Sequence, residues 1–237
     1  MKSKKNSKKK LCIAFDGYSA SGKSLGAKLI SKKYQLNLLN SGLLYRYAAF
    51  LILNNKPKRK IFFLKKKFLK LDYKYLTRLN LHSEKISGYS SIIAKQKKVR
   101  LVLAEYQKKF ARKFNRIAIE GRDISTKILN KNPRYDVAFF FKCNLNTAAF
   151  RRWRDLKTIN KQITLNEVKK SLKKRNELDV KRRFSPLIQS KDSIIIRTDI
   201  LNKKAMVAKM SEVIDKKLLL KYGKRFKQNW YKNKINK

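Results

Sequence analysis

The stretch IAFDGYSASGKS, residues 13–24, decides the fold of this chain. It meets the pattern G-x-x-x-x-G-K-[S/T] at Gly17, Gly22, Lys23 and Ser24. The apolar run at 11–16 predicts a buried strand, and the apolar spacing over 23–34 predicts a helix. A glycine-bearing loop between a strand and a helix presents backbone amides and the positive end of the helix dipole to an anion. The pattern therefore predicts a loop that binds the phosphates of a nucleotide.

The side chains of this loop have separate expected tasks. Lys23 reaches the β- and γ-phosphates, and the hydroxyl of Ser24 is offered to Mg²⁺. The residues expected around the nucleoside triphosphate are Gly17, Tyr18, Ser19, Ala20, Ser21, Gly22, Lys23, Ser24 and Leu25. The competing interpretation is a glycine–serine turn with a solvated lysine. The strand pattern before the loop and the helix pattern after it argue against that interpretation.

Strand-like and helix-like segments alternate along the rest of the chain. Further strands are expected at 116–120, 136–142 and 193–197, and helices at 42–53, 87–114, 146–158, 164–180 and 203–220. The segment 57–82 mixes helical and alternating patterns, and we expect it to form an insertion outside the main sheet. The alternation predicts an α/β fold with a central parallel sheet.

The charge of the chain is extreme. Its 237 residues include 63 Lys and Arg against 15 Asp and Glu, a formal net charge of +48. Such a charge attracts polyanions, including nucleotides, RNA, DNA and anionic membranes. The basic residues are dispersed over helical patterns, which favours a compositional bias on solvated faces over a dedicated nucleic-acid surface. Because folding must overcome this repulsion, we expect salt or bound anions to stabilise the protein.

Few residues qualify for metal or redox chemistry. Cys12 and Cys143 lie in apolar runs and are expected to be buried thiols in a reducing compartment. His82 is the only histidine, and we expect it on the surface of the insertion. The first residues lack the pattern of a signal peptide, and no apolar run reaches the roughly 18 residues of a membrane span. We expect a cytoplasmic protein with basic tails at 1–10 and 223–237.

Polar side chains gather where predicted strands end. NSGLLYR (residues 40–46) places Ser41 and Arg46 at the start of a helix, just after a short strand. EGRD (residues 120–123) places Arg122 and Asp123 at the carboxyl end of another strand. Ligands of open parallel sheets bind at this edge, where the phosphate loop also lies. One such arginine alone is typical of a solvated surface, but their joint placement at the same edge as the loop favours a functional role.

Six segments together resemble the bacterial cytidylate kinases in order and spacing. They are IAFDGYSASGKS, NSGLLYR, VRLVLAEYQKKF, IEGRDIS, AFRRWRDL and SPLIQSKDSIII, between about residues 11 and 220. The resemblance implies a three-layer P-loop kinase fold over residues 11–222, with a central parallel β-sheet, a monophosphate-binding insertion at about 55–98 and a mobile lid at about 150–165. It implies transfer of the γ-phosphate of ATP to CMP or dCMP with Mg²⁺, by a monomer.

The resemblance also implies a role for individual residues. Catalytic roles would fall to Lys23, Arg122 and Arg182, of which Arg182 would lie near the phosphates. The residues expected at CMP are Ser41, Arg46, Ser91, Arg100, Arg122, Asp123, Arg175, Asp179 and Arg182. Within this set, Arg46 and Arg122 would clamp the acceptor phosphate, Ser91, Arg100 and Asp123 would face cytosine, and Ser41, Arg175 and Asp179 would lie near the sugar. The lid or its base would contain Arg151, Arg152 and Arg154.

These roles agree with elementary chemistry. Cytosine offers an amino donor that Asp123 can accept, and its N3 and O2 can accept from Arg100. Uracil would turn a carbonyl oxygen toward the carboxylate and be penalised. The acceptor phosphate is already an anion, so no strong general base is needed, and catalysis consists of positioning, charge neutralisation and exclusion of water.

Several positions depart from the usual pattern of this family. Tyr18 stands for Pro, Ala20 for Gly, Asn40 and Glu120 for Asp, and Ser125 for Gly, while Arg197 stands where an acidic residue is common. None of these changes removes a residue expected to bind phosphate. They bear on base selectivity more than on kinase activity.

Two other functions remain open at this level. One is a P-loop kinase of another small acceptor, such as UMP, against which the set Ser91, Arg100 and Asp123 argues. The other is an inactive, basic, nucleic-acid-binding relative, which the charge supports. The intact phosphate loop and the arginines at the strand ends oppose it, because a binding protein need not keep the geometry of phosphoryl transfer.

Overall fold

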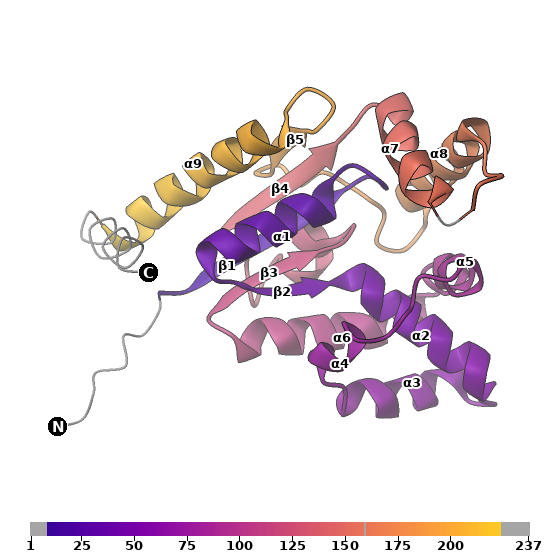
Figure 1. Cartoon of the computed structure of the whole chain (residues 1–237). Coiled ribbons are helices and arrows are strands. Elements are labelled where there is room, and N and C mark those ends of the chain that lie inside the picture. Colours follow the sequence, from indigo (N-terminus) through magenta and orange to yellow (C-terminus); the bar gives the residue numbers. More distant parts are fainter. Residues whose placement is uncertain (1–8, 159, 224–237) are drawn as a thin grey trace.

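A computed structural model describes residues 9–158 and 160–223, and it is built around one five-stranded sheet (Figure 1). The strands are β1 (Leu11–Gly17), β2 (Asn37–Asn40), β3 (Arg116–Glu120), β4 (Val137–Lys142) and β5 (Ile194–Arg197). Their order is β2-β3-β1-β4-β5, and every neighbouring pair is parallel. Helices connect successive strands, as parallel pairing requires. The predicted α/β fold with a central parallel sheet is confirmed.

The central strand shows why the sequence folds this way. Ile13, Ala14 and Phe15 in β1 have no exposed surface, because helices cover both faces of the sheet. A strand buried on both faces is a continuous apolar run rather than an alternating one, and LCIAF is such a run. Successive side chains still point to opposite faces. Ile13 and Phe15 therefore join one core, and Ala14 joins the other.

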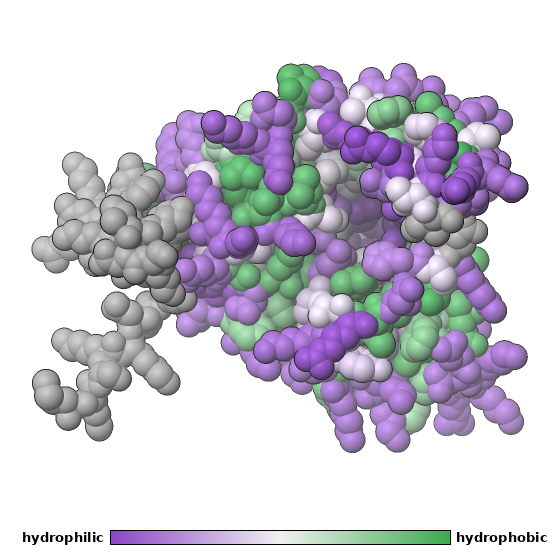
Figure 2. Space-filling view, viewed as in Figure 1, coloured by the Kyte–Doolittle hydropathy of each residue, from purple (hydrophilic) through white to green (hydrophobic). Residues whose placement is uncertain are grey.

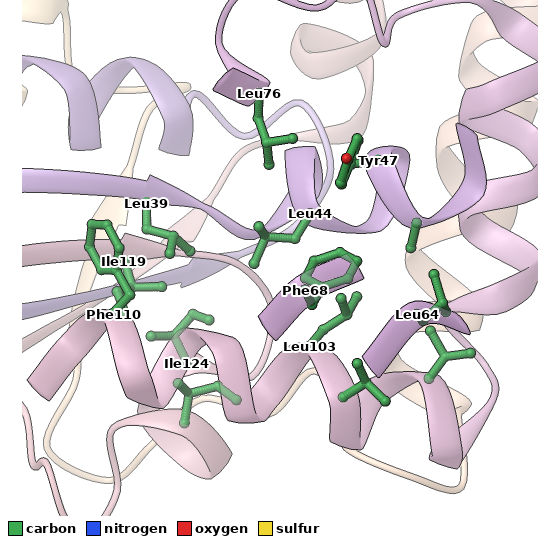
Figure 3. Packing of buried hydrophobic residues seen from close by; sticks show 14 of the residues in the cluster. Leu39, Leu44, Tyr47, Leu64, Phe68, Leu76, Leu103, Phe110, Ile119 and Ile124 are labelled. Carbon is green, nitrogen blue, oxygen red and sulfur yellow. The ribbon is translucent and has the colours of Figure 1, made fainter. Parts of the chain in front are cut away.

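Two hydrophobic layers enclose the sheet. On one face lie α1 (Lys23–Tyr34) and α9 (Lys203–Tyr222), which pack Ile30 and Met210 against Phe15 and its neighbours. On the other face lie α2 (Ser41–Asn55) and α6 (Lys97–Lys113), with the insertion beyond them. Figure 3 shows side chains of this second layer, including Leu44, Phe68 and Leu103. This layer extends outward into the insertion and supports its helices.

The segment that we expect to form the insertion is helical, and none of the five strands of the sheet lies in it. Its helices are α3 (Lys60–Leu69), α4 (Tyr73–Leu76) and α5 (Glu84–Ile93). The prediction of one long helix over 87–114 is wrong, because α5 ends at Ile93 and α6 begins at Lys97. Gln96 has an extended backbone at the break, and the guanidinium of Arg100 donates to the Ala94 carbonyl at 3.1 Å. The chain turns between the two helices, and the apolar periodicity did not predict this turn.

A helical hairpin stands apart from both layers. It consists of α7 (Leu145–Lys157) and α8 (Leu165–Lys181), and the expected lid falls within it. Its own small core contains Ala148, Ala149, Val168 and Leu172. A capping box at Thr164 and Glu167 starts α8. The apolar core of the hairpin is separate from the two layers of the sheet. The hairpin is therefore attached to the rest of the protein largely by contacts outside those two layers.

The remaining sequence expectations have mixed outcomes. Cys12 and Cys143 are half-buried rather than fully buried thiols, and burial raises the pKa of Cys12 to about 12. A π-helical turn at Ile124–Ile128 was not expected. The expected basic tails lie almost entirely outside the described residues. Over 9–158 and 160–223, no helix combines the length and apolar character needed to cross a membrane.

Candidate active site

A cleft of 1460 Å³ opens at the carboxyl edge of the sheet. The phosphate loop, the start of α2, α5, the end of β3 and the hairpin α7–α8 surround it. The predicted site residues that line it are Tyr18, Ser19, Ala20, Ser21, Gly22, Lys23, Ser24, Leu25, Ser41, Arg46, Ser91, Arg100, Arg122, Asp123, Arg151, Arg152, Arg154, Arg175, Asp179 and Arg182. Of the predicted set, Gly17 alone lies off the cleft. The structure thus brings together residues from distant segments of the chain.

The phosphate loop is held by its own hydrogen bonds. The Ser21 hydroxyl donates to the Tyr18 carbonyl at 2.8 Å, and Thr198 donates to the Ser21 carbonyl at 3.0 Å. Ala20 and Gly22 both have left-handed backbones, with φ of 56° and 75°. For Gly22 this conformation is easy, whereas for Ala20 it costs energy. The methyl group of Ala20 packs against the small core of the hairpin.

Gly17 packs against β4 and does not line the cleft. Its φ is 150°, a conformation open to glycine, and a Cβ at this position would lie 2.4 Å from the Phe141 carbonyl oxygen. The next residue, Tyr18, donates its amide to the same oxygen at 3.2 Å. Gly17 therefore allows β1 to approach β4 closely at the point where the loop begins.

Lys23 is a buried cation. Only 7% of its surface is exposed, and its Nζ lies 3.6 Å from the Glu120 carboxylate. Burial, with the nearby Arg122, lowers the pKa of Lys23 from 10.5 to about 8. Ser24 also uses Glu120, to which its hydroxyl donates at 2.7 Å. The two side chains expected to meet phosphate and Mg²⁺ are therefore held by one carboxylate.

Several arginines lie close together in the cleft. Burial, then Arg152 and Arg122, lower the pKa of Arg46. Desolvation between the cleft walls, followed by Arg122, lowers the pKa of Arg175 to about 10. Nε of Arg46 and Nη2 of Arg182 are buried without a hydrogen-bond partner among the described residues. Unpartnered buried donors beside other cations fit a phosphate group, which would satisfy the donors and neutralise the charge.

Asp179 links two of these arginines. Nε of Arg122 donates to its carboxylate at 2.9 Å, and Nη1 of Arg182 donates at 3.1 Å. Arg122 also donates to the Ser19 hydroxyl at 3.0 Å. Although burial alone would raise it, Arg122 and Arg182 hold the pKa of Asp179 below its usual range. The carboxylate thus fixes two guanidinium groups at the wall of the cleft.

Two of the residues expected to read the base, Arg100 and Asp123, form an ion pair in the wall of the cleft. Arg100 donates to Asp123 at 2.5 Å, and both side chains are almost fully buried. The guanidinium of Arg100 also lies over the ring of Tyr45, 5.4 Å from its centre. Ser91 also lines the cleft, and its hydroxyl donates to the Ser87 carbonyl at 3.2 Å. The break between α5 and α6 allows Arg100 and Ser91 to face one pocket from two helices.

Sequence reasoning missed several supporting residues. Gln107 donates to the Ser41 hydroxyl at 2.6 Å and is itself buried. The buried carboxylate of Asp16 accepts the amides of Ile124 and Ser125 at 2.8 Å each, which fixes the turn after Asp123. Asp16 directly precedes the loop motif, and this position was a usable signal. Gln107 follows no comparable pattern.

The arginines of the hairpin differ in their contacts. Nη2 of Arg151 donates to the Thr198 carbonyl at 2.8 Å, so this residue anchors the hairpin near the end of β5. Arg152 and Arg154 line the cleft. His82 is exposed, as expected, and it also lies at the edge of the cleft, where burial and then Arg46 lower its pKa.

Comparisons with known proteins agree with this geometry. The family model described as "Cytidylate kinase" matches residues 13–216. A cytidylate kinase of Mesomycoplasma hyopneumoniae (strain 7448) is 30% identical over 222 residues, covering 89% of this chain and 96% of the relative. A cytidylate kinase of Rickettsia akari (strain Hartford) is 32% identical over 213 residues, covering 89% and 94%.

A solved structure shares the fold. The crystal structure of an uncharacterized protein from Eubacterium ventriosum superposes with a TM-score of 0.53 at 16% identity. The match covers 88% of this chain and 99% of that one. At this identity the likeness concerns the fold alone.

Proposed function

The chain belongs to the cytidylate kinase family, an ATP-dependent nucleoside-monophosphate kinase family, and we propose that this cleft transfers the γ-phosphate of ATP to CMP or dCMP. The observation that carries the proposal is the buried pair of Arg100 and Asp123 in the same cleft as the phosphate loop. The pair offers cytosine one acceptor and several donors, which match its amino group, N3 and O2.

The donor nucleotide is proposed to bind at the loop. The amides of residues 18–24 and the N-terminus of α1 would surround its phosphates, with Lys23 at the β- and γ-phosphates. An incoming triphosphate would stabilise the charged form of Lys23, whose pKa burial has lowered. Because the amine is already buried and held by Glu120, little side-chain reorganisation is needed.

The residues beside the loop also fit Mg²⁺. The Ser24 hydroxyl and the Glu120 carboxylate are adjacent oxygen donors, the type that Mg²⁺ prefers. No cluster of three or more His, Cys, Asp or Glu residues suited to a metal occurs in the part of the chain that the structure describes. Sparse protein ligands fit a cation that keeps waters and phosphate oxygens as its other ligands. When bound, Mg²⁺ would neutralise charge on the transferring phosphate.

The acceptor is proposed to bind between α2, α5 and α8. Arg46 and Arg122 would hold its phosphate, and Arg182 would lie beside them with its unpartnered Nη2. Ser41, oriented by Gln107, would face the sugar together with Arg175 and Asp179. Ser91, Arg100 and Asp123 would contact the base. In this arrangement, the acceptor phosphate and the donor loop share one cationic space.

Catalysis then depends on positioning rather than on proton transfer. The attacking group is an anionic phosphate oxygen, so the arginines need only align it with the γ-phosphate and offset the repulsion between the two anions. Arg152 and Arg154 on the hairpin would add donors as the cleft closes. Closure would exclude water, which otherwise competes as an acceptor. We further propose that the enzyme works as a monomer in the cytoplasm.

The test is an ATP·Mg²⁺ assay of diphosphate formation with CMP, dCMP, UMP, AMP and GMP. Moderate salt screens non-specific binding to the many basic residues of the chain, and hydrophilic side chains cover much of the face shown in Figure 2. We expect turnover of CMP and dCMP that is lost in Lys23→Ala. Turnover restricted to UMP or AMP would refute the base assignment. A folded protein that binds ATP but phosphorylates none of the five would refute the proposed reaction.

A further inference from the structure

Helix α8 is joined to the phosphate loop by a side chain that has no role in the proposed reaction. Oδ1 of Asn176 accepts the backbone amide of Ser19 at 2.9 Å. Ser19 is buried, with 3% of its surface exposed. The two residues are 157 positions apart in the sequence. This contact is therefore a tertiary link between the loop that would hold ATP and the hairpin that would close over it.

Two further hydrogen bonds form a ring with the first. The Ser19 hydroxyl accepts from Arg122 at 3.0 Å, and Arg122 donates to Asp179 at 2.9 Å. Asp179 lies three residues after Asn176, so both side chains project from one face of α8. Ser19 thus holds α8 directly through its amide and indirectly through Arg122.

These contacts matter because, over residues 9–158 and 160–223, the hairpin makes few other hydrogen bonds to the phosphate loop or the sheet. Its apolar core is its own, and Ala20 of the loop packs against that core. Arg151 adds the hydrogen bond to Thr198. Two adjacent loop residues, Ser19 and Ala20, therefore supply much of the described contact between the hairpin and the phosphate loop. The left-handed backbone of Ala20 places its methyl group in this contact despite the conformational cost.

The position of α8 decides where Arg175 lies. Arg175 immediately precedes Asn176 in the same helix, and it faces the cleft with Arg122 and Arg46 nearby. A helix is stiff over these few residues, so fixing Asn176 on the loop fixes the origin of the Arg175 side chain. A misplacement of about 1 Å in such a group is enough to slow a reaction that depends on alignment.

We propose that Asn176 is a positioning residue that registers α8 on the phosphate loop and so aligns Arg175 with the phosphates. The inference rests on the proposed function. A carboxamide suits the task because its oxygen accepts the amide without adding a negative charge. A carboxylate at this position would accept the same amide but would also oppose the binding of anionic substrates.

The experiment compares three variants. Asn176→Leu keeps the approximate shape and removes the acceptor, and Asn176→Asp keeps the acceptor and adds charge. Glu177→Leu is the control, on the next residue, which does not line the cleft. We measure kcat and KM with CMP, and hydrogen exchange of the Ser19 amide in the ligand-free protein.

We expect Asn176→Leu to lower kcat about five- to tenfold, the worth of one net hydrogen bond, and to speed exchange at Ser19. Asn176→Asp is expected to retain most of kcat and the protection at Ser19 while raising KM. Glu177→Leu should match the wild type. The proposal is overturned if Asn176→Leu leaves kcat unchanged, or if Asn176→Asp loses kcat as Asn176→Leu does.

The two readouts separate this inference from the proposed function. If the wild type phosphorylates no nucleotide, the proposed reaction fails, and the inference about alignment fails with it. The exchange of the Ser19 amide would then still report whether α8 is held on the loop. If the wild type is active and Ser19 exchanges equally fast in wild type and Asn176→Leu, the reaction stands and the positioning role is refuted.

Discussion

The buried Lys23 destabilises the ligand-free protein, and its replacement by Met should reveal the cost. The pKa of Lys23 falls from 10.5 to about 8, mainly because burial desolvates the amine. At about 1.4 kcal/mol for each tenfold change in proton affinity, folding disfavours the charged amine by about 3 kcal/mol at neutral pH. Methionine has a similar length and no charge, so Lys23→Met removes this cost with little change in packing.

The loss of a partner for Glu120 offsets part of the gain. Nζ of Lys23 lies 3.6 Å from Glu120, whose carboxylate would keep the hydrogen bond from Ser24. We therefore expect Lys23→Met to raise the free energy of unfolding at pH 7 by about 1–3 kcal/mol. Lys28→Met is the control, on the exposed side of the same helix, and should change stability by less than about 0.5 kcal/mol.

The direction in which pH changes the contribution of Lys23 to stability follows from its pKa in the folded and unfolded states. Between about pH 8 and pH 10.5 the folded protein has released the Lys23 proton while the unfolded chain still holds it. The free energy of unfolding of the wild type therefore increases as pH rises through this window. Below about pH 8 the amine is charged in both states, and the full cost of burying its charge remains. Other lysines titrate in both proteins, so the difference between wild type and variant isolates Lys23.

Urea denaturation of both proteins from pH 7 to 10.5 measures this difference. The advantage of Lys23→Met should shrink as pH rises and vanish near the upper end. Saturating ATP should stabilise the wild type more than the variant, since the charged amine then meets phosphate. A variant that is less stable than the wild type at pH 7, or a gap that does not close with pH, would refute the reasoning.

Three further changes follow from the geometry. Gly17→Ala places a methyl group 2.4 Å from a backbone oxygen of Phe141 and should cost about 3 kcal/mol or more in urea denaturation. Gly88→Ala, in a helix with nothing within 4 Å of the added methyl, should instead stabilise by about 0.5–1 kcal/mol. Asp123→Asn should lower kcat/KM for CMP. It should also raise the ratio of UMP to CMP use about tenfold or more, because a carboxamide can donate to the uracil carbonyl. Equal losses with both nucleotides would contradict the base assignment.

Much of the fold followed from the local pattern. The phosphate loop, the strand before it and the helix after it were predictable, because a continuous apolar run and an apolar face repeat over short distances. The strand at 116–120 has the predicted bounds for the same reason. The break in the helix expected over 87–114 was not predictable, and at this break Arg100 donates to the Ala94 carbonyl. Helix periodicity carries no sign of such a side-chain contact.

In the site, too, the sequence predicted some features and only the tertiary structure revealed others. The motif spacing and the family resemblance selected the residues that line the cleft, including the arginines at the strand ends. The tertiary structure alone revealed how they are held: Glu120 between Lys23 and Ser24, and Asp179 between two arginines. Asn176 had no signal in the sequence, since it meets Ser19 across 157 residues. Local patterns are set by neighbours along the chain, whereas such contacts arise only when packing of the sheet and helices brings distant segments within hydrogen-bonding distance.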